Sequence, residues 1–128
     1  MGSSIRNPGA WYRSIIESSN DAIIGKDLNG LVTSWNPAAE RMFGYREEEI
    51  FGRPITQLIP RERHGEEKVI LGRILQGEHI QHYETVRIRK NGANFPASIS
   101  ISPIRNSDGR LIGAAKIIRD ISERKAAG

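Results

Sequence analysis

The sequence contains no cysteine. Disulfide bonds, thiolate nucleophiles and cysteine metal sites are therefore excluded. Long apolar runs are also missing, because no stretch approaches the ~20 residues that a membrane-spanning helix needs. The first residues, Met1 to Ser4, lack the apolar stretch of a secretion signal. We therefore expect a cytoplasmic location and no membrane contact by this segment.

Charge of one sign is not concentrated anywhere in the chain. The net charge is +4, but Lys and Arg are scattered among Asp and Glu, so no nucleic-acid partner is predicted. The three histidines, His64, His79 and His82, form no metal-ligand cluster. Neither a Ser-His-Asp arrangement nor a phosphate-binding glycine loop is present. We predict no catalytic residues and no metal site, so that this chain is not itself an enzyme.

What the sequence does contain is enough for one domain. Its 128 residues are 38% hydrophobic and 27% charged, as in an ordinary soluble domain with a single core. Residues 1–8 are expected to be disordered N-terminal residues or a vector remnant. Residues 9–19 are expected to form an amphipathic helix, because Trp11, Tyr12, Ile15 and Ile16 recur at helical spacing. Such a face must be buried somewhere, and we predict a homodimer formed through it.

Turn and capping residues divide the next part of the chain. Strands are predicted at 21–27 and 31–35, joined by a tight turn at Asn29-Gly30. Asn36 and Pro37 are suited to the N-cap and first turn of a helix over 37–43, which Gly44 ends. A further helical turn is expected over 47–50.

The clearest helical pattern covers residues 66–76. Ile70, Leu71, Ile74 and Leu75 repeat at helical spacing, and Gly77 closes the helix. Gly72 inside it costs about 1 kcal/mol relative to Ala, which indicates either a close approach or simple tolerance, and the second explanation is preferred.

Strands separated by turn signals complete the pattern. They are predicted over 83–90, 94–104 and 110–121 and form an antiparallel meander. Pro96 is uncomfortable in a central strand, so it should lie near a bulge or the strand near an edge. The fold class is α+β, a five-stranded antiparallel sheet with short helices on one face. Strand order does not follow from these patterns.

Six segments resemble the PAS family in order and spacing, over roughly residues 12–125. They are Asp21-Ala22-Ile23-Ile24, Trp35-Asn36-Pro37-Ala38-Ala39, Phe43-Gly44-Tyr45, Glu49-Ile50-Phe51-Gly52, Arg87-Ile88-Arg89-Lys90-Asn91-Gly92 and Arg119-Asp120-Ile121-Ser122-Glu123-Arg124. The resemblance implies strand order 2-1-5-4-3, a family core over 20–122 and the start of an outgoing signalling helix over 123–128.

The resemblance also implies a site and a route for a signal. Asp120-Ile121-Ser122 is similar to the family's Asp-Ile-Thr exit motif and would tie the sheet to the outgoing helix, although Asp120 as a plain strand end is the alternative. A cavity between sheet and helix would be lined by Met42, Ile59, Ile70, Ile74, Ile88, Phe95, Ile99 and Ile117. An ordinary filled core would need the same residues. Trp35 could couple the first hairpin to Asp120 through its indole N–H, or be a buried aromatic with an incidental partner.

No cofactor is required by these residues. A flavin that bonds covalently to cysteine is excluded, whereas non-covalent flavin stays open. Heme would need an axial ligand such as His64, His79 or His82. At the position of the ligand in the heme-binding members this sequence has Glu66, Glu67 and Lys68, which argues against heme.

The resemblance implies a sensory module of a bacterial signalling protein. The leading hypothesis is a domain that binds a small molecule or a partner, dimerises and regulates a C-terminal effector, first a histidine kinase and second a diguanylate cyclase. The alternatives are an interaction and dimerisation domain without a ligand and an enzyme on a similar scaffold.

Overall fold

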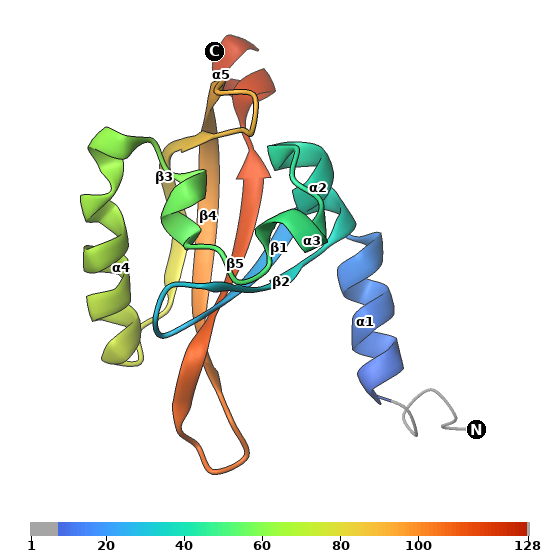
Figure 1. Cartoon of the computed structure of the whole chain (residues 1–128), viewed down its shortest axis with the longest axis vertical. Coiled ribbons are helices and arrows are strands. Elements are labelled where there is room, and N and C mark those ends of the chain that lie inside the picture. Colours follow the sequence, from blue (N-terminus) through green and yellow to red (C-terminus); the bar gives the residue numbers. More distant parts are fainter. Residues whose placement is uncertain (1–7, 128) are drawn as a thin grey trace.

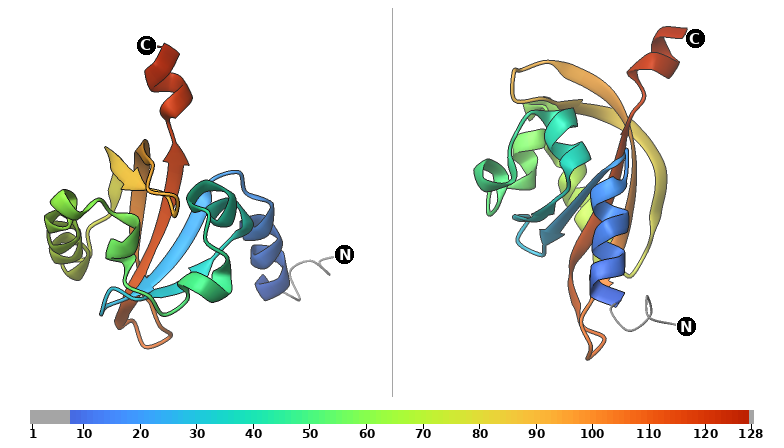
Figure 2. Two further views of the ribbon diagram at one scale, coloured as in Figure 1. Left: turned by 45° about the horizontal axis from the view of Figure 1, so that its top comes forward. Right: turned by 90° about the vertical axis from the view of Figure 1, so that its right-hand side faces the viewer.

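The computed structural model describes residues 8–127 and has the predicted α+β architecture. A five-stranded antiparallel sheet has the order β2-β1-β5-β4-β3, as the resemblance implied. Helices α2, α3 and α4 gather on one face of the curved sheet (Figures 1 and 2). No helix in residues 8–127 is both long and apolar enough to cross a membrane.

The N-terminal helix α1 (Pro8–Ser18) leads into the first hairpin, β1 (Ala22–Asp27) and β2 (Val32–Trp35). α1 starts one residue earlier than predicted, and the expected disorder of residues 1–7 lies outside the described residues. The hairpin turn has Gly30 at φ 81°, and the Asp27 carboxylate accepts hydrogen bonds from Asn29 N and Leu31 N. The turn is therefore present at the predicted place, but only Gly30 takes a positive φ, and Asn29 does not.

Helix α2 (Pro37–Phe43) has the predicted caps. Asn36 Oδ1 accepts a hydrogen bond from Ala39 N at 3.0 Å, and Gly44 takes a left-handed conformation with φ 88°. α3 (Glu47–Ile50) follows, and then two short 3₁₀ turns, η1 (Ile55–Leu58) and η2 (Arg61–Arg63), which the sequence patterns did not indicate. These turns carry the chain across the sheet to α4 (Figure 1).

The second half of the chain is α4 (Gly65–Leu75), the three long strands and a terminal helix. The strands are β3 (Ile80–Ile88), β4 (Asn94–Arg105) and β5 (Leu111–Asp120), and α5 (Ser122–Ala127) leaves the sheet at its upper end in Figure 1. β3 begins three residues before its predicted start, with an irregularity between Ile80 and Tyr83.

Pro96 lies in β4, which pairs with both β3 and β5 and is not an edge strand. Neither predicted explanation applies, because the ladder irregularities of β4 lie elsewhere, between Ile80 and Tyr83 and between Ile104 and Arg105. Instead Pro96 O accepts from Ile121 N, while the carbonyl of Ile121 accepts from Lys125 N in α5. A residue with an N–H at position 96 would compete with Lys125 N for the carbonyl of Ile121. Proline therefore suits the point where the sheet ends and α5 begins.

Candidate functional site

Buried charges join α4 to the centre of the sheet. Lys26 of β1 and Lys116 of β5 are only 2% and 1% exposed. Both ammonium groups pair with the Glu67 carboxylate of α4, Lys116 Nζ at 2.7 Å from Oε1 and Lys26 Nζ on Oε2. One carboxylate thus pairs with two cations beneath the helix. The low dielectric there strengthens the attraction between the charges and also increases the cost of removing them from water.

The pKa values of this buried triad are shifted by opposing effects. Burial lowers the pKa of Lys116 from 10.5 to about 8, although the negative charge of Glu67 favours the protonated form and acts in the other direction. Burial alone would raise the pKa of Glu67, but the charges of Lys116 and Lys26 outweigh it, so that this pKa is lowered. Glu67 is therefore ionised at neutral pH, and burial makes Lys116 easier to neutralise than an ordinary lysine.

A second charged group lies beside the triad, between α4 and β3. The guanidinium of Arg87, 2% exposed, donates from Nη1 to Glu66 Oε1 at 3.1 Å and to Val86 O at 2.8 Å. Glu66 also accepts from the Thr85 hydroxyl at 2.8 Å and from Arg63 at 3.0 Å. Burial alone would raise the pKa of Glu66, but these hydrogen bonds hold it below the usual value.

The structure brings together most of the residues predicted to line a cavity. Ile70, Ile74, Phe95 and Ile99 are buried members of the core cluster, Ile59 is buried, and Met42 packs against the core. They lie between the sheet and the helices as parts of a packed interior. Whether any of them contacts a ligand stays a prediction.

Two predicted lining residues lie on the opposite face of the sheet, and this corrects the prediction. Ile117 is 44% exposed, because its neighbour Lys116 points inward. Ile88 pairs with Asn94, whereas the adjacent pair of Arg87 with buried Phe95 faces the core. Side chains alternate along a strand, so an inward charge places the next apolar residue outside. The prediction treated apolar residues as inward and so missed Lys26, Arg87 and Lys116.

At the exit of the sheet, Asp120 and Ser122 connect β5 to α5. Asp120 Oδ1 accepts hydrogen bonds from Ser122 N at 2.9 Å and from the Ser122 hydroxyl at 2.5 Å. Arg89 donates to Asp120 Oδ2 at 2.7 Å and to the carbonyl of Met42 at 2.6 Å, and its guanidinium lies over the Phe95 ring. Burial alone would raise the pKa of Asp120, but Ser122 and Arg89 lower it overall.

Trp35 does not contact Asp120 in the way considered from the sequence. Its indole N–H donates to the carbonyl of Tyr45 at 2.9 Å. The ring packs 5.7 Å from that of Phe43, so Trp35 fastens β2 to the loop after α2. The predicted coupling of the first hairpin to Asp120 through Trp35 is therefore wrong. Arg89 is the residue that bonds Asp120.

The three histidines lie away from the core. His64 is exposed and its Nε2 is 2.9 Å from Ile59 O. His79 is exposed beside Ser102, and exposed His82 occupies the β3 irregularity with φ 53°. A heme ligand would have to point into an apolar cavity, so these residues do not fit a heme. The inward side chains at the start of α4 are instead Glu66 and Glu67.

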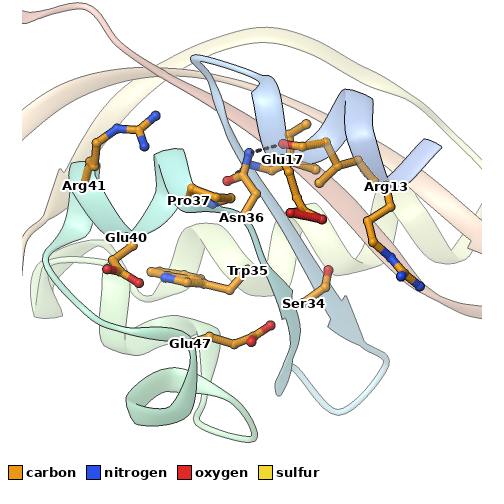
Figure 3. Close-up of a pocket in the computed structure, with 11 residues that line it drawn as sticks. Arg13, Glu17, Ser34, Trp35, Asn36, Pro37, Glu40, Arg41 and Glu47 are labelled. Carbon is orange, nitrogen blue, oxygen red and sulfur yellow. Dashed lines mark hydrogen bonds between the residues drawn. The ribbon is translucent and has the colours of Figure 1, made fainter. Parts of the chain in front are cut away.

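Next to α1 lies an open groove with a volume of about 750 Å³. Figure 3 shows Arg13 and Glu17 of α1 on one side of the groove and Glu40 and Arg41 of α2 on the other, with Asn36 between them. The side-chain amide of Asn36 donates to the carbonyls of Ile16 at 2.9 Å and Asp21 at 3.1 Å. This residue therefore fixes the end of α1 to the domain.

The predicted dimerisation residues of α1 are all exposed. Trp11 is 53%, Tyr12 58%, Ile15 49% and Ile16 40% exposed. Large apolar side chains gathered on one exposed helix favour burial against a partner. Whether this chain dimerises stays a prediction.

Comparison with known proteins gives the family. The model of the PAS fold matches residues 10–121, and the chain belongs to this family. The crystal structure of the PAS domain of a protein from Colwellia psychrerythraea has a TM-score of 0.81 and 27% identity, covering 91% of this chain and 99% of that one.

Two of the curated relatives are named as signalling proteins. The signal transduction histidine-protein kinase AtoS of Escherichia coli is 32% identical, over 98% of this chain and 20% of that protein. The probable diguanylate cyclase DgcE of the same organism is 25% identical, over 86% of this chain and 10% of that protein. This chain is a PAS sensory domain of the kind found in such proteins, and it spans at most about a fifth of these two relatives.

Proposed function

We propose that this domain is a regulatory module that carries a conformational change from its helix-covered face to α5 and then to a C-terminal effector, with a histidine kinase as the first candidate and a diguanylate cyclase as the second. The observation that supports this most is the position of Arg89, which bonds both the last turn of α2, through Met42 O, and Asp120 at the end of β5, just before α5. A shift of α2 would thus be felt at the exit helix.

An Asp120→Asn variant tests this relay. Loss of the charge weakens the bonds to Arg89 and Ser122, and we expect the amide hydrogens of Ser122 and Lys125 to exchange about tenfold faster. Hydrogen exchange followed by NMR measures this. Asp108→Asn, in the exposed turn between β4 and β5, is the matched control and should leave both rates unchanged. Equal rates in Asp120→Asn and the parent protein would contradict the relay.

The same proposal includes dimerisation through α1. The exposed apolar residues of α1 adjoin the groove that Ile16 and Trp35 help to line, and a second copy of the chain could cover both. Asn36 would then connect the interface to the core, since it bonds Ile16 O, Ile23 N and Ala39 N.

Single substitutions in α1 test the dimer. Ile15→Asp and Ile16→Asp place a charge in the apolar face, and we expect each to raise the dimer dissociation constant by at least about tenfold. Analytical ultracentrifugation at micromolar concentration gives the values, with Arg13→Lys as a control that keeps the charge. A parent protein that sediments as a monomer at all concentrations would refute the interface.

A second candidate is an interaction and dimerisation domain with no small ligand. The packed interior favours it, because Ile70, Ile74 and Ile99 fill the space between α4 and the sheet. Native mass spectrometry separates the two candidates, since a retained metabolite would add its mass to the folded protein.

A further inference from the structure

The strand β3 is bonded to a helix on each of its two faces. On the face that α4 covers, the Thr85 hydroxyl donates to Glu66 Oε2 at 2.8 Å, and Arg87 Nη1 donates to Glu66 Oε1 at 3.1 Å. Glu84, the neighbour of Thr85, is exposed and lies on the opposite face, because side chains alternate along a strand. There its carboxylate pairs with residues of α5. One strand thus connects α4 to the exit helix.

Two cations of α5 share the Glu84 carboxylate. Arg124 Nη2 donates to Oε2, and Lys125 Nζ lies 3.1 Å from Oε1. The hydrogen bonds from Arg124 and Lys125 lower the pKa of Glu84, so that it is ionised at neutral pH. A single exposed ion pair contributes little to stability. Two pairs on one carboxylate nevertheless restrict the direction of a helix that is otherwise attached only at its first turn.

The outer face of the sheet leaves room for this contact. Ser98 of β4 is the register partner of Glu84, and its small side chain lies between Glu84 and Arg119 of β5. The Arg119 guanidinium is held by Asp21 at 3.1 Å, on the side away from β4. Ile121 N donates to a carbonyl of β4, which brings the start of α5 against that strand. The cations of α5 can therefore reach Glu84 across β4.

We propose that Glu84 is a positioning residue for α5 and that its pairs with Arg124 and Lys125 form a latch, the Glu84 latch. While the latch is closed the exit helix keeps one direction, and a shift of β3 opens it. Because Glu66 holds the other face of the same strand, a movement of α4 reaches α5 through β3, independently of Arg89. This regulatory role rests on the proposed function, whereas the latch can be measured without an effector.

Spin labels measure the direction of α5. The chain has no cysteine, so Thr33→Cys in β2 and Ala126→Cys in α5, both at exposed positions, give one labelled pair for double electron–electron resonance. Glu84→Lys should widen the distance distribution at least about twofold, because repulsion replaces both ion pairs. Glu78→Lys is the matched control and should leave the width unchanged, since Glu78 has the same side-chain exposure, 43%, but pairs with Arg73.

Exchanging the charges separates a latch from a general loss of structure. Glu84→Lys combined with Arg124→Glu and Lys125→Glu again places opposite charges on β3 and α5, and the narrow distribution should return. An unchanged width in Glu84→Lys, or no recovery in the combined variant, would overturn the latch.

Thr85→Val tests the connection to α4. It removes the hydroxyl that bonds Glu66 and keeps the branched shape of the side chain, so it should widen the distribution in the parent protein and add nothing in Glu84→Lys. A width that Thr85→Val leaves unchanged in the parent protein would overturn the route through β3. The Asp120→Asn exchange rates report the connection through Arg89, so the latch and the relay can fail separately.

Discussion

Glu67→Gln is expected to lower the free energy of unfolding by about 3–5 kcal/mol, because it leaves two buried ammonium groups without a counter-charge. Lys26 and Lys116 both pair with this one carboxylate, and a glutamine keeps its shape but not its charge. Urea denaturation followed by circular dichroism measures the difference. The variant should remain folded only at low denaturant concentration.

Lys116→Met is the matched control for that prediction. It removes the surplus cation and leaves Lys26 and Glu67 as a single pair, so its free energy of unfolding should lie within about 1 kcal/mol of the parent value or above it. If the lysine variant is as unstable as Glu67→Gln, the charge argument is wrong and simple packing explains both.

The triad also predicts a dependence on pH. Burial lowers the pKa of Lys116 to about 8 from the 10.5 of an unperturbed lysine. Between these values the unfolded chain binds more protons than the folded one, so stability should rise with pH, by up to about 1.4 kcal/mol per pH unit. Below pH 8 both states are protonated and this contribution is constant. This rise should be absent in Lys116→Met, so the free energies of unfolding of the parent protein and the variant should draw apart as the pH increases. Parallel curves of unfolding free energy against pH for the two proteins would contradict the shifted pKa.

Gly113→Ala is expected to cost at least about 2–3 kcal/mol, because the added methyl group has no room. A Cβ on Gly113 would lie 2.1 Å from the carbonyl oxygen of Lys26 in β1. That atom belongs to backbone, and β5 is hydrogen-bonded to β1 on one side and β4 on the other. Neither neighbour can move without breaking ladder hydrogen bonds.

Gly72→Ala should have the opposite effect. Apart from its chain neighbours and the nearby backbone of α4, no atom lies within 4 Å of a Cβ built on Gly72, and the residue is exposed in the middle of α4. Alanine should therefore stabilise by about 0.5–1 kcal/mol through helix propensity. Urea denaturation of both variants tests the pair. Similar effects at the two positions would show that the close approach of β5 and β1 is not what Gly113 serves.

The local elements could be predicted because their causes are local. Asn29-Gly30 forms a turn and Asn36 caps α2, in each case with partners a few residues away along the chain. The apolar residues of α4 repeat on one side of the helix, and this side buries Ile70 and Ile74. The strand order followed from the resemblance to a family and not from the patterns. The missed 3₁₀ turns have no strong periodicity, and β3 starts early because its first residues form an irregular pairing.

The class of fold, the caps and turns, and the segments that resemble the PAS family follow from the sequence alone. Tertiary structure alone decided which side of each strand faces the helices, and so placed Arg87 and Lys116 inside and Ile117 outside. Alternation defines two faces without saying which is covered. A charge is placed in the interior only when a partner reaches it from elsewhere in the chain, as Glu67 does for Lys26 and Lys116, and such partners become neighbours only when the chain folds.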